Sequence, residues 1–334
     1  MKTKVTAKLM SSLSEWGLLR KWTIKNMVFI AILIAISVSF TVVAAQLMPI
    51  VNIPSFKFSF IGLPVKITGF VFGPVIGVFV GVVSDLLSLL FVPPVGYNPM
   101  YTLATAINGL ISGIFGLYFV SFLQYAFSKE YRLERISIKI TLLAQKYRKL
   151  SKNEATMEKA IKVGDKLIKL NSKRAFIRDD NSKDILKNVY TTAAVFLISL
   201  VIIIITYYVG FWVPDKYIEK GLIPNRWGLL ALMITGMSLL LIFIIVARFK
   251  MRVERFLIFV PIIVFSAFLE LINIPILSLG DNMSLGNGET KDIFLWITQH
   301  IISSPVKIWF NVFVIYYSYS IIIKLIKKNS KLGY

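Results

Sequence analysis

Residues 62–87 read GLPVKITGFVFGPVIGVFVGVVSDLL and lie within an apolar block that runs from Phe58 to Val92. A helix needs roughly 20 apolar residues to cross about 30 Å of hydrocarbon, so this block is too long for one crossing. Gly73-Pro74 interrupts the block near its middle, where proline lacks a backbone donor and breaks a helix. The stretch therefore predicts two short helices that meet at this dipeptide, in an all-α polytopic membrane protein.

Apolar segments of spanning length recur along the rest of the chain, in which 56% of the residues are hydrophobic. A soluble domain does not have this composition. Together with the two helices of the 58–92 block, the further segments predict eight spans in all. The further spans are expected at Met27 to Ile50, Pro99 to Gln124, Val189 to Trp212, Trp227 to Ala247, Phe256 to Leu277 and Trp296 to Ile323.

Basic residues gather between these segments. The stretch from Lys129 to Lys187 holds 17 Lys or Arg against 8 Asp or Glu, and further clusters occupy 248–255 and 324–331. Cytoplasmic loops of membrane proteins carry such an excess, so we expect these stretches and both termini in the cytoplasm of a cell membrane protein. The segment 278–291 then falls outside. Because the net charge of +21 lies between apolar runs, nucleic acid is not an expected partner.

The chain offers little for catalysis. It contains no cysteine and one histidine, which excludes thiolate metal sites and Cys-His catalysis. It also lacks the glycine-rich loop that cradles phosphates and shows no paired carboxylates beside phosphate-binding arginines. We therefore expect a protein that is not an enzyme, has no cofactor and holds no metal. The N-terminal apolar stretch exceeds a signal-peptide core, which favours a retained first helix.

Four glycines, Gly69, Gly73, Gly77 and Gly81, recur every fourth residue through the paired short helices. Such a row permits close helix contact, either within the protein's own core or against a partner that slides past it. Asp85 follows on the same segment. A carboxylate at membrane depth needs a partner, so Asp85 is predicted to accept hydrogen bonds near a helix end or to contact a ligand.

These residues resemble a family. Residues 62–87 look like the second and third helices of S components, the substrate-binding subunits of energy-coupling-factor (ECF) transporters. Residues 94–113, PVGYNPMYTLATAINGLISG, are similar to the third loop and fourth helix of the folate-type members. Ala31 and Ala35 match the alanine motif by which the first helix of these proteins docks on the coupling subunit, although such pairs also serve generic packing.

The resemblance implies a six-helix core that captures a vitamin, folate first, from outside. Its implied partners are a transmembrane coupling subunit and two ATP-binding-cassette ATPase subunits, which drive import. Two alternatives remain: an S component for riboflavin or another vitamin, and a stand-alone ion-coupled secondary transporter, which Asp85, Glu270 and Lys307 would serve.

The resemblance also divides the chain into four parts. Residues 1–125 correspond to S-component helices 1–4, and 254–334 to helices 5–6 with a basic tail. Between them, 126–188 form a basic cytoplasmic helical insertion and 189–253 two inserted transmembrane helices. The basic insertion is predicted to be a helical hairpin that contacts anionic lipid or the ATPases, or else a solvated spacer.

Polar and aromatic residues near the outer ends of the spans are the candidates for ligand contact, because folate combines an aromatic pterin with carboxylates. Glu270 would hold the pterin, and Lys57 or Lys66 the tail. Each has an alternative: Tyr97, Tyr101 and Trp296 as interfacial aromatics, Lys57 in water, Glu270 and Lys307 as an ion pair, His300 as a polar end residue. The predicted substrate-binding residues are Phe56, Lys57, Phe58, Lys66, Tyr97, Asn98, Tyr101, Glu270, Asn273, Gln299, His300 and Lys307.

Overall fold

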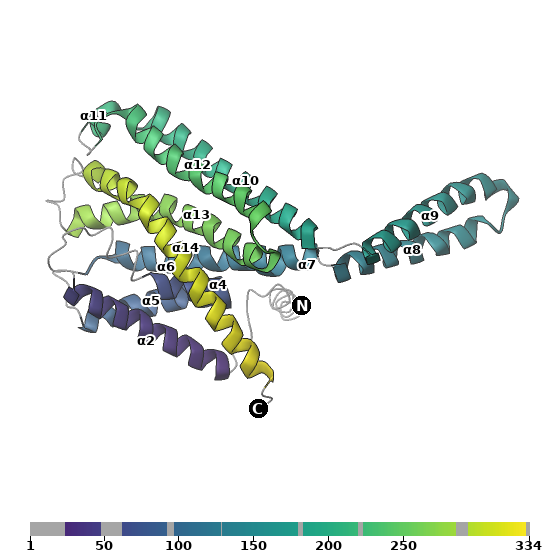
Figure 1. Ribbon diagram of the computed structural model, residues 1–334, viewed down its shortest axis with the longest axis horizontal. Helices are drawn as coiled ribbons and strands as arrows, with labels where there is room; N and C mark the ends of the chain where they lie inside the picture. Colours follow the sequence, from purple (N-terminus) through teal and green to yellow (C-terminus); the bar gives the residue numbers. More distant parts are fainter. Residues whose placement is uncertain are drawn as a thin grey trace, which may run out of the picture. The chain divides into compact units, whose positions relative to one another are not determined.

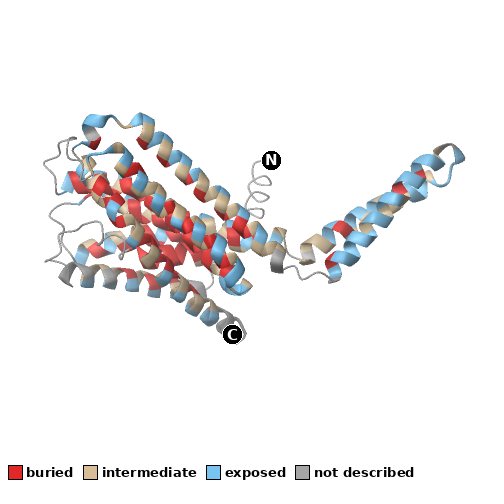
Figure 2. Ribbon diagram, turned by 45° about the horizontal axis from the view of Figure 1, so that its top comes forward, coloured by how far each residue is buried: buried red, intermediate tan, exposed pale blue. Residues whose placement is uncertain are grey.

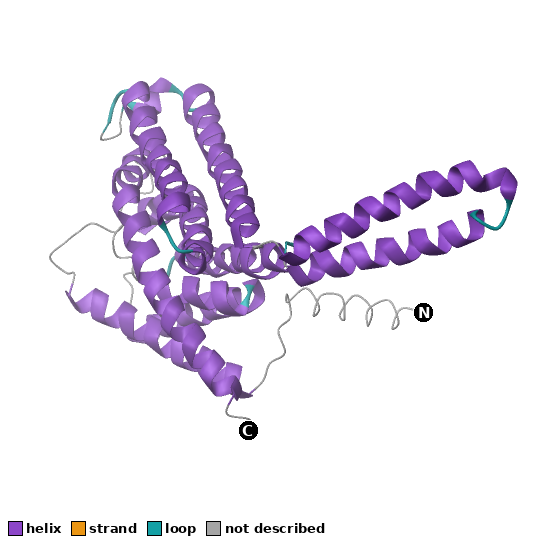
Figure 3. Cartoon of the chain, turned by 45° about the vertical axis from the view of Figure 1, so that its right-hand side comes forward, coloured by secondary structure: helices purple, strands orange, loops and turns teal. Residues whose placement is uncertain are grey.

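The computed structural model describes residues 24–47, 62–91, 97–127, 129–179, 183–219, 223–284 and 293–331. Within these ranges the chain is helical almost throughout and contains no strand, as Figure 3 shows. The predicted all-α class is confirmed. The ranges that are described fall into two compact units, one made of 122–190 and the other of the residues before and after it.

The break at Gly73-Pro74 is confirmed. Helix α4 (Leu63–Phe72) ends at Gly73, whose φ of 99° lies in a region that residues with a side chain rarely adopt, and α5 (Pro74–Phe91) begins at the proline. The helical hydrogen bonds still extend to both ends of α4, because the Lys66 amide donates to the Gly62 carbonyl and the Gly73 amide donates to the Gly69 carbonyl. At 1.5 Å per residue, α4 is about 15 Å long, roughly half of a bilayer's hydrocarbon.

Six helical stretches are long and apolar enough to cross a membrane, and two of the predicted spans are shorter apolar helices, Met27–Val43 and Leu63–Phe72. The shorter pair lie in α2 (Ile24–Leu47) and α4. The six stretches are α5, α6 (Pro99–Phe115) with η1 (Gly116–Leu123) and α7 (Gln124–Ala126), α10 (Lys183–Tyr207) with η3 (Tyr208–Trp212), α12 (Arg226–Lys250), α13 (Val253–Ser284) and α14 (Ile293–Lys331).

Helix α13 is the most buried of the candidate spans, with 72% of its most apolar window inside the bundle, against 28–44% for the other five. It packs against α6 and α14, while α4 contacts α5, α6 and α14 (Figure 1). Buried residues accordingly concentrate around α13 in Figure 2. Helix α2 contacts α4 and α5 and packs Ile30 and Leu33 into an apolar cluster with Phe72 and Val80.

Glycines bring α4 and α5 against α6 at backbone distance. A side chain added at Gly69 or Gly77 would clash with the carbonyl oxygen of Gly109, and one at Gly81 would lie 2.6 Å from that of Thr105. The glycine row therefore contacts the protein's own fourth predicted span along three of its four members. The fourth member, Gly73, serves the turn instead.

The short helix α11 (Asp215–Ile218) follows η3. At the start of α12, Arg226 contacts the backbone at the end of η3. Its guanidinium donates to the carbonyl oxygens of Val209, Gly210 and Val213 at 2.5–2.9 Å and forms an ion pair with Asp215. These carbonyls lie at a helix C-terminus, where they have no intrahelical partner. Arg226 therefore satisfies backbone groups that the helix leaves open.

The second unit contains a helical hairpin, as predicted for the basic insertion. Helix α8 (Lys129–Leu150) and α9 (Met157–Asp179) pack along their length and are joined through η2 (Glu154–Thr156). Ile136, Ala160, Val163 and Ile177 are buried in this unit. Most of the remaining hairpin surface is exposed (Figure 2).

Candidate functional site

A buried polar network joins α6, α13 and α14 at one end of the bundle. The hydroxyl of Tyr101 donates to Asp281 Oδ1 at 2.8 Å, and His300 Nε2 lies 2.8 Å from Asp281 Oδ2. On the other side of the imidazole, Lys307 Nζ is 3.3 Å from His300 Nδ1 and 3.5 Å from Glu270 Oε2. Five ionisable or hydroxyl groups thus form one connected chain among described residues.

Helix geometry explains why these groups meet. Glu270, Asn273, Leu277 and Asp281 are three or four residues apart and therefore share one face of α13. His300, Ser303 and Lys307 repeat the pattern on α14. Helices α13 and α14 are consecutive in the chain and pack against each other. The last turns of α13 therefore lie beside the first turns of α14. The polar stripe extends about 16 Å along α13, from Glu270 to Asp281.

The contact with Lys307 indicates which tautomer of the imidazole is present. A lysine ammonium has only donors, so Lys307 can approach His300 Nδ1 closely only when that nitrogen accepts. The ring proton then resides on Nε2 and is donated to the Asp281 carboxylate. In this arrangement the acidic groups are both held by donors, which is what a buried carboxylate needs.

Lys66 of α4 faces the same cluster. Its side chain is only 2% exposed, and it interacts electrostatically with Glu270 and with Lys307. The ammonium group of Lys66 forms no hydrogen bond or ion pair within the described part of the chain. Two cations and two carboxylates therefore surround this end of the bundle.

Amide groups line the same region. Asn273 Nδ2 donates to Asn108 Oδ1 at 2.7 Å, while Asn273 Oδ1 and Asn282 Oδ1 are buried acceptors without a donor among the described residues. Asn98 begins α6 as its N-cap and donates to the Gly280 carbonyl and to Ser284 at 2.8 Å. Unsatisfied buried acceptors carry a free-energy cost, and a bound molecule with N–H groups would remove it.

The predicted site residues fall into three groups. The structure brings six of them together in or beside the network: Lys66, Asn98, Tyr101, Glu270, His300 and Lys307, and it places Asn273 on the same face. Tyr97 is 54% exposed and its hydroxyl is 3.1 Å from Thr102 Oγ1, and Gln299 is half-buried. Phe56, Lys57 and Phe58 lie outside the described residues.

Two expectations need correction. His300 is not a polar residue at an exposed end, because it is 1% exposed and lies in the centre of the network. The span predicted to stop at Leu277 continues as α13 to Ser284, so Asp281 lies buried in a helix rather than in an outer loop. Sequence reasoning missed Asp281, Asn282 and Asn108 as site residues. The three- and four-residue spacing from Glu270 to Asp281 was the available signal.

Asp85 takes part in a smaller contact nearby. Its Oδ2 accepts a hydrogen bond from Thr102 Oγ1 at 2.6 Å, so a residue of α5 is held by one of α6. This geometry matches the predicted acceptor role more closely than direct ligand contact.

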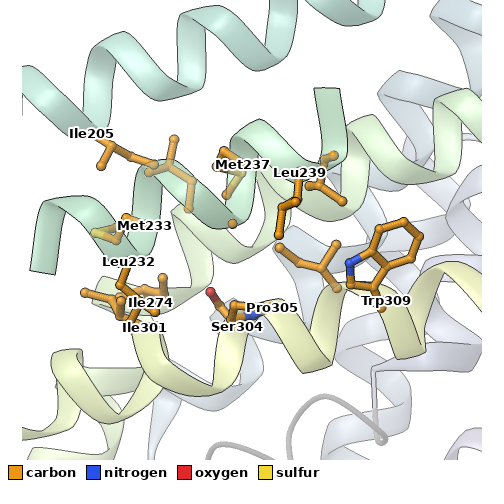
Figure 4. A pocket seen from close by; sticks show the side chains of 14 residues that line it. Ile205, Leu232, Met233, Met237, Leu239, Ile274, Ile301, Ser304, Pro305 and Trp309 are labelled. Carbon is orange, nitrogen blue, oxygen red and sulfur yellow. The ribbon is translucent and has the colours of Figure 1, made fainter. Parts of the chain in front are cut away.

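A separate cavity of about 40 Å³ lies among α10, α12, α13 and α14 (Figure 4). Its lining is apolar, with Met237, Ile274 and Trp309 among the side chains that face it. Its volume admits only a few water-sized molecules, and it offers few polar groups for recognition. The polar network is therefore the better candidate for a site that recognises a substrate.

Comparisons with known proteins bear on the family of the chain. The sequence profile of the family "ECF transporter, substrate-specific component" matches residues 25–222, more than half of the chain. The protein named "Folate transporter FolT" from Clostridium novyi (strain NT) is 34% identical over 89 residues, which cover 27% of this chain and 49% of that protein. The chain thus aligns with about half the length of this curated relative. No solved structure matches the chain.

Proposed function

We propose that this chain, which belongs to the family of substrate-specific components of ECF transporters, captures folate outside the cell and delivers it for ATP-driven import. The chain is accordingly a multi-pass membrane protein that serves transport. The observation that carries the folate proposal is the buried network of Tyr101, Asp281, His300, Lys307 and Glu270 inside a bundle of apolar helices. Its amides and charges suit a substrate that bears both N–H groups and carboxylates.

The chemistry of folate fits these groups in pairs. The pterin presents an amino group and a ring N–H side by side, which one carboxylate can accept as two parallel hydrogen bonds. Glu270 or Asp281 offers this acceptor, and Asn273 Oδ1 is a further buried acceptor. The glutamate tail bears carboxylates, which could pair with Lys66. This buried cation forms no ion pair with a carboxylate of the described residues. The relative named as a folate transporter supports the same substrate.

Import would depend on partners, namely a transmembrane coupling subunit and two ATPase subunits. Helix α2 supports this proposal, because it buries Ile30, Leu33 and Ser37 within the bundle and leaves Ala31 and Ala35 exposed. Small residues four apart make a flat helix face against which another helix packs closely. Replacing both alanines by leucine should abolish co-purification of the coupling subunit and leave folate binding unchanged.

The binding test uses the purified full chain in detergent. We expect folates to bind at submicromolar concentration, measured by isothermal titration calorimetry, and mass spectrometry of the purified protein to identify the same vitamin. Riboflavin in the same assay distinguishes the alternative vitamin. If neither folates nor riboflavin-like ligands bind in this range, the proposed capture of a vitamin is wrong.

A variant pair locates the site. Glu270→Gln removes a carboxylate from the network, whereas Glu254→Gln removes one at the exposed start of the same helix. Loss of one charged, buried hydrogen-bonding partner costs about 1.5–3 kcal/mol, which corresponds to a roughly 10- to 150-fold weaker affinity. The control should bind like the unmodified chain. Equal affinities for both variants would exclude Glu270 from the site.

The connected titratable groups also favour a second candidate, a stand-alone carrier coupled to protons. Asp281, His300 and Lys307 form the kind of relay that proton-coupled transporters use. The chain alone in liposomes would then accumulate substrate under a proton gradient without ATP. Binding without such uptake, and uptake only after the ATPase and coupling subunits are added, supports the first proposal.

A further inference from the structure

The outward surface of α9 carries two parallel stripes that the fold of the hairpin does not use. One is a row of exposed lysines spaced three and four residues apart, which places them on one side of the helix. The other is a row of apolar side chains on the adjoining side of the helix, each 49–70% exposed, with Glu158 and Asp165 between the two rows. The lysine row consists of Lys159, Lys162, Lys166, Lys169 and Lys173, and the apolar row of Met157, Ile161, Ile168 and Phe176.

Neither row is needed to hold the hairpin together. Helix α9 packs against α8 through the side that adjoins the lysine row, where Ala160, Val163 and Ile177 are buried. Within the described part of the chain, Lys162 is the member of the row with an ion-pair partner, Glu158 at 2.8 Å. The apolar row leaves large side chains in water, which is unfavourable unless another surface covers them.

The chain connectivity brings a bilayer within reach of this surface. Helix α9 ends at Asp179, six residues before the apolar stretch Ile185–Trp212 that is long enough to cross a membrane. Six residues span at most about 20 Å, so Phe176 stays close to the point where the chain enters the bilayer. The preceding apolar stretch ends at Ala126, three residues before α8 begins. The hairpin is thus tethered to the membrane at both ends.

We propose that the lysine and apolar rows of α9 bind the surface of an anionic lipid bilayer. A helix with a basic side and an adjacent apolar side lies in the interface, where lysine head groups meet lipid phosphates and apolar side chains enter the acyl boundary. An acidic protein surface would satisfy the lysines but not Ile168 and Phe176 beside them. The proposal does not rest on the vitamin, since it concerns lipid and a separate unit of the chain.

The test uses the full chain, which contains no cysteine, so that Ser172→Cys provides a single site for a spin label on the exposed side of α9. The labelled protein is reconstituted in vesicles of phosphatidylcholine alone or mixed with phosphatidylglycerol. Paramagnetic resonance then compares collisions of the label with oxygen, which partitions into lipid, and with a water-soluble nickel chelate. We expect the oxygen-to-nickel collision ratio to rise at least severalfold in the anionic vesicles and to fall again in high salt.

A matched pair of triple variants tests whether the row itself is responsible. Lys166→Gln, Lys169→Gln and Lys173→Gln remove three charges from the row, whereas Lys146→Gln, Arg148→Gln and Lys149→Gln remove three exposed charges from α8. Each basic group near an anionic surface strengthens association roughly fivefold, so the first set should abolish the lipid signal and the second should largely keep it. Circular dichroism checks that both sets keep their helix content.

Three outcomes would overturn the proposal. The label could show the same collision ratio in neutral and anionic vesicles, the α8 set could abolish the signal as fully as the α9 set, or the label could lose nickel access only after the ATPase subunits are added. The last result would assign this surface to a protein partner instead.

Discussion

Asp281 is the residue whose removal should damage the bundle most directly. Its side chain is 0% exposed, and its two carboxylate oxygens accept from Tyr101 and from His300, each at 2.8 Å. Asp281→Ala removes the acceptor that the Tyr101 hydroxyl and the His300 ring share. Because α6, α13 and α14 each contribute one of these residues, the loss affects the contact among three helices.

The expected cost follows from the two bonds. A hydrogen bond to a charged group contributes about 1.5–3 kcal/mol, so the alanine variant should be less stable by about 3–6 kcal/mol. Asp281→Asn keeps an oxygen for His300 and offers its amide to the Tyr101 oxygen, so it loses the charge but retains both contacts. We expect the asparagine variant to lose less than half as much stability as the alanine variant.

Thermal denaturation in detergent, followed by loss of the monodisperse elution peak, measures the difference. The alanine variant should lower the midpoint by roughly 5–15 °C. Asp165→Ala, which removes an exposed carboxylate from α9, should leave it within the error. A midpoint for Asp281→Ala equal to that of the Asp165 control would show that Asp281 is not a buried acceptor, and the network as described would be refuted.

Two further predictions concern the frame around the site. Gly77→Ala should destabilise the bundle by about 1–3 kcal/mol, because the new methyl group would clash with the Gly109 backbone. Gly236→Ala, where the nearest atom is Pro305 Cγ at 3.7 Å, should be tolerated, and equal midpoints for the two variants in the same denaturation assay would contradict the backbone contact. Arg226→Gln should speed amide hydrogen exchange of the segment 209–215, which contains the carbonyl groups that accept from the guanidinium. Lys250→Gln, at an exposed position, should leave this exchange unchanged, and unchanged exchange in the Arg226 variant would mean that those contacts do not stabilise the helix end.

The helices themselves were largely predictable from the sequence, because the signals that define them are local. Apolar length identified each candidate span, and Gly73-Pro74 identified a break that the structure places at the same residue. Proline and glycine act on the backbone of their own position, whatever packs around them. The basic stretch likewise contains two helices, because its apolar residues recur at helical intervals.

The end of α13 was not predictable in this way. Ser278, Gly280 and Asp281 resemble a loop by composition, yet the helix continues through them because Tyr101, Asn98 and His300 provide partners. Two of these partners are about 180 residues away in the chain. A single sequence does not reveal such pairs, so the burial of Asp281 required the three-dimensional arrangement. Glu270 and Lys307 were recognisable earlier because each lies within an apolar run.

The contact between Gly77 and Gly109 has a mechanical consequence. Where two helices touch through their main chains, no side chain lies between them that could change rotamer when one helix shifts. Helices α5 and α6 are therefore expected to move together as a rigid body. On the opposite side of the bundle, α12 makes far fewer contacts with α13 and α14. Any opening that admits a substrate would therefore be taken up by the elements facing this rigid body, while Tyr101 and Asn108 on α6 stay in place as a fixed reference for whatever binds.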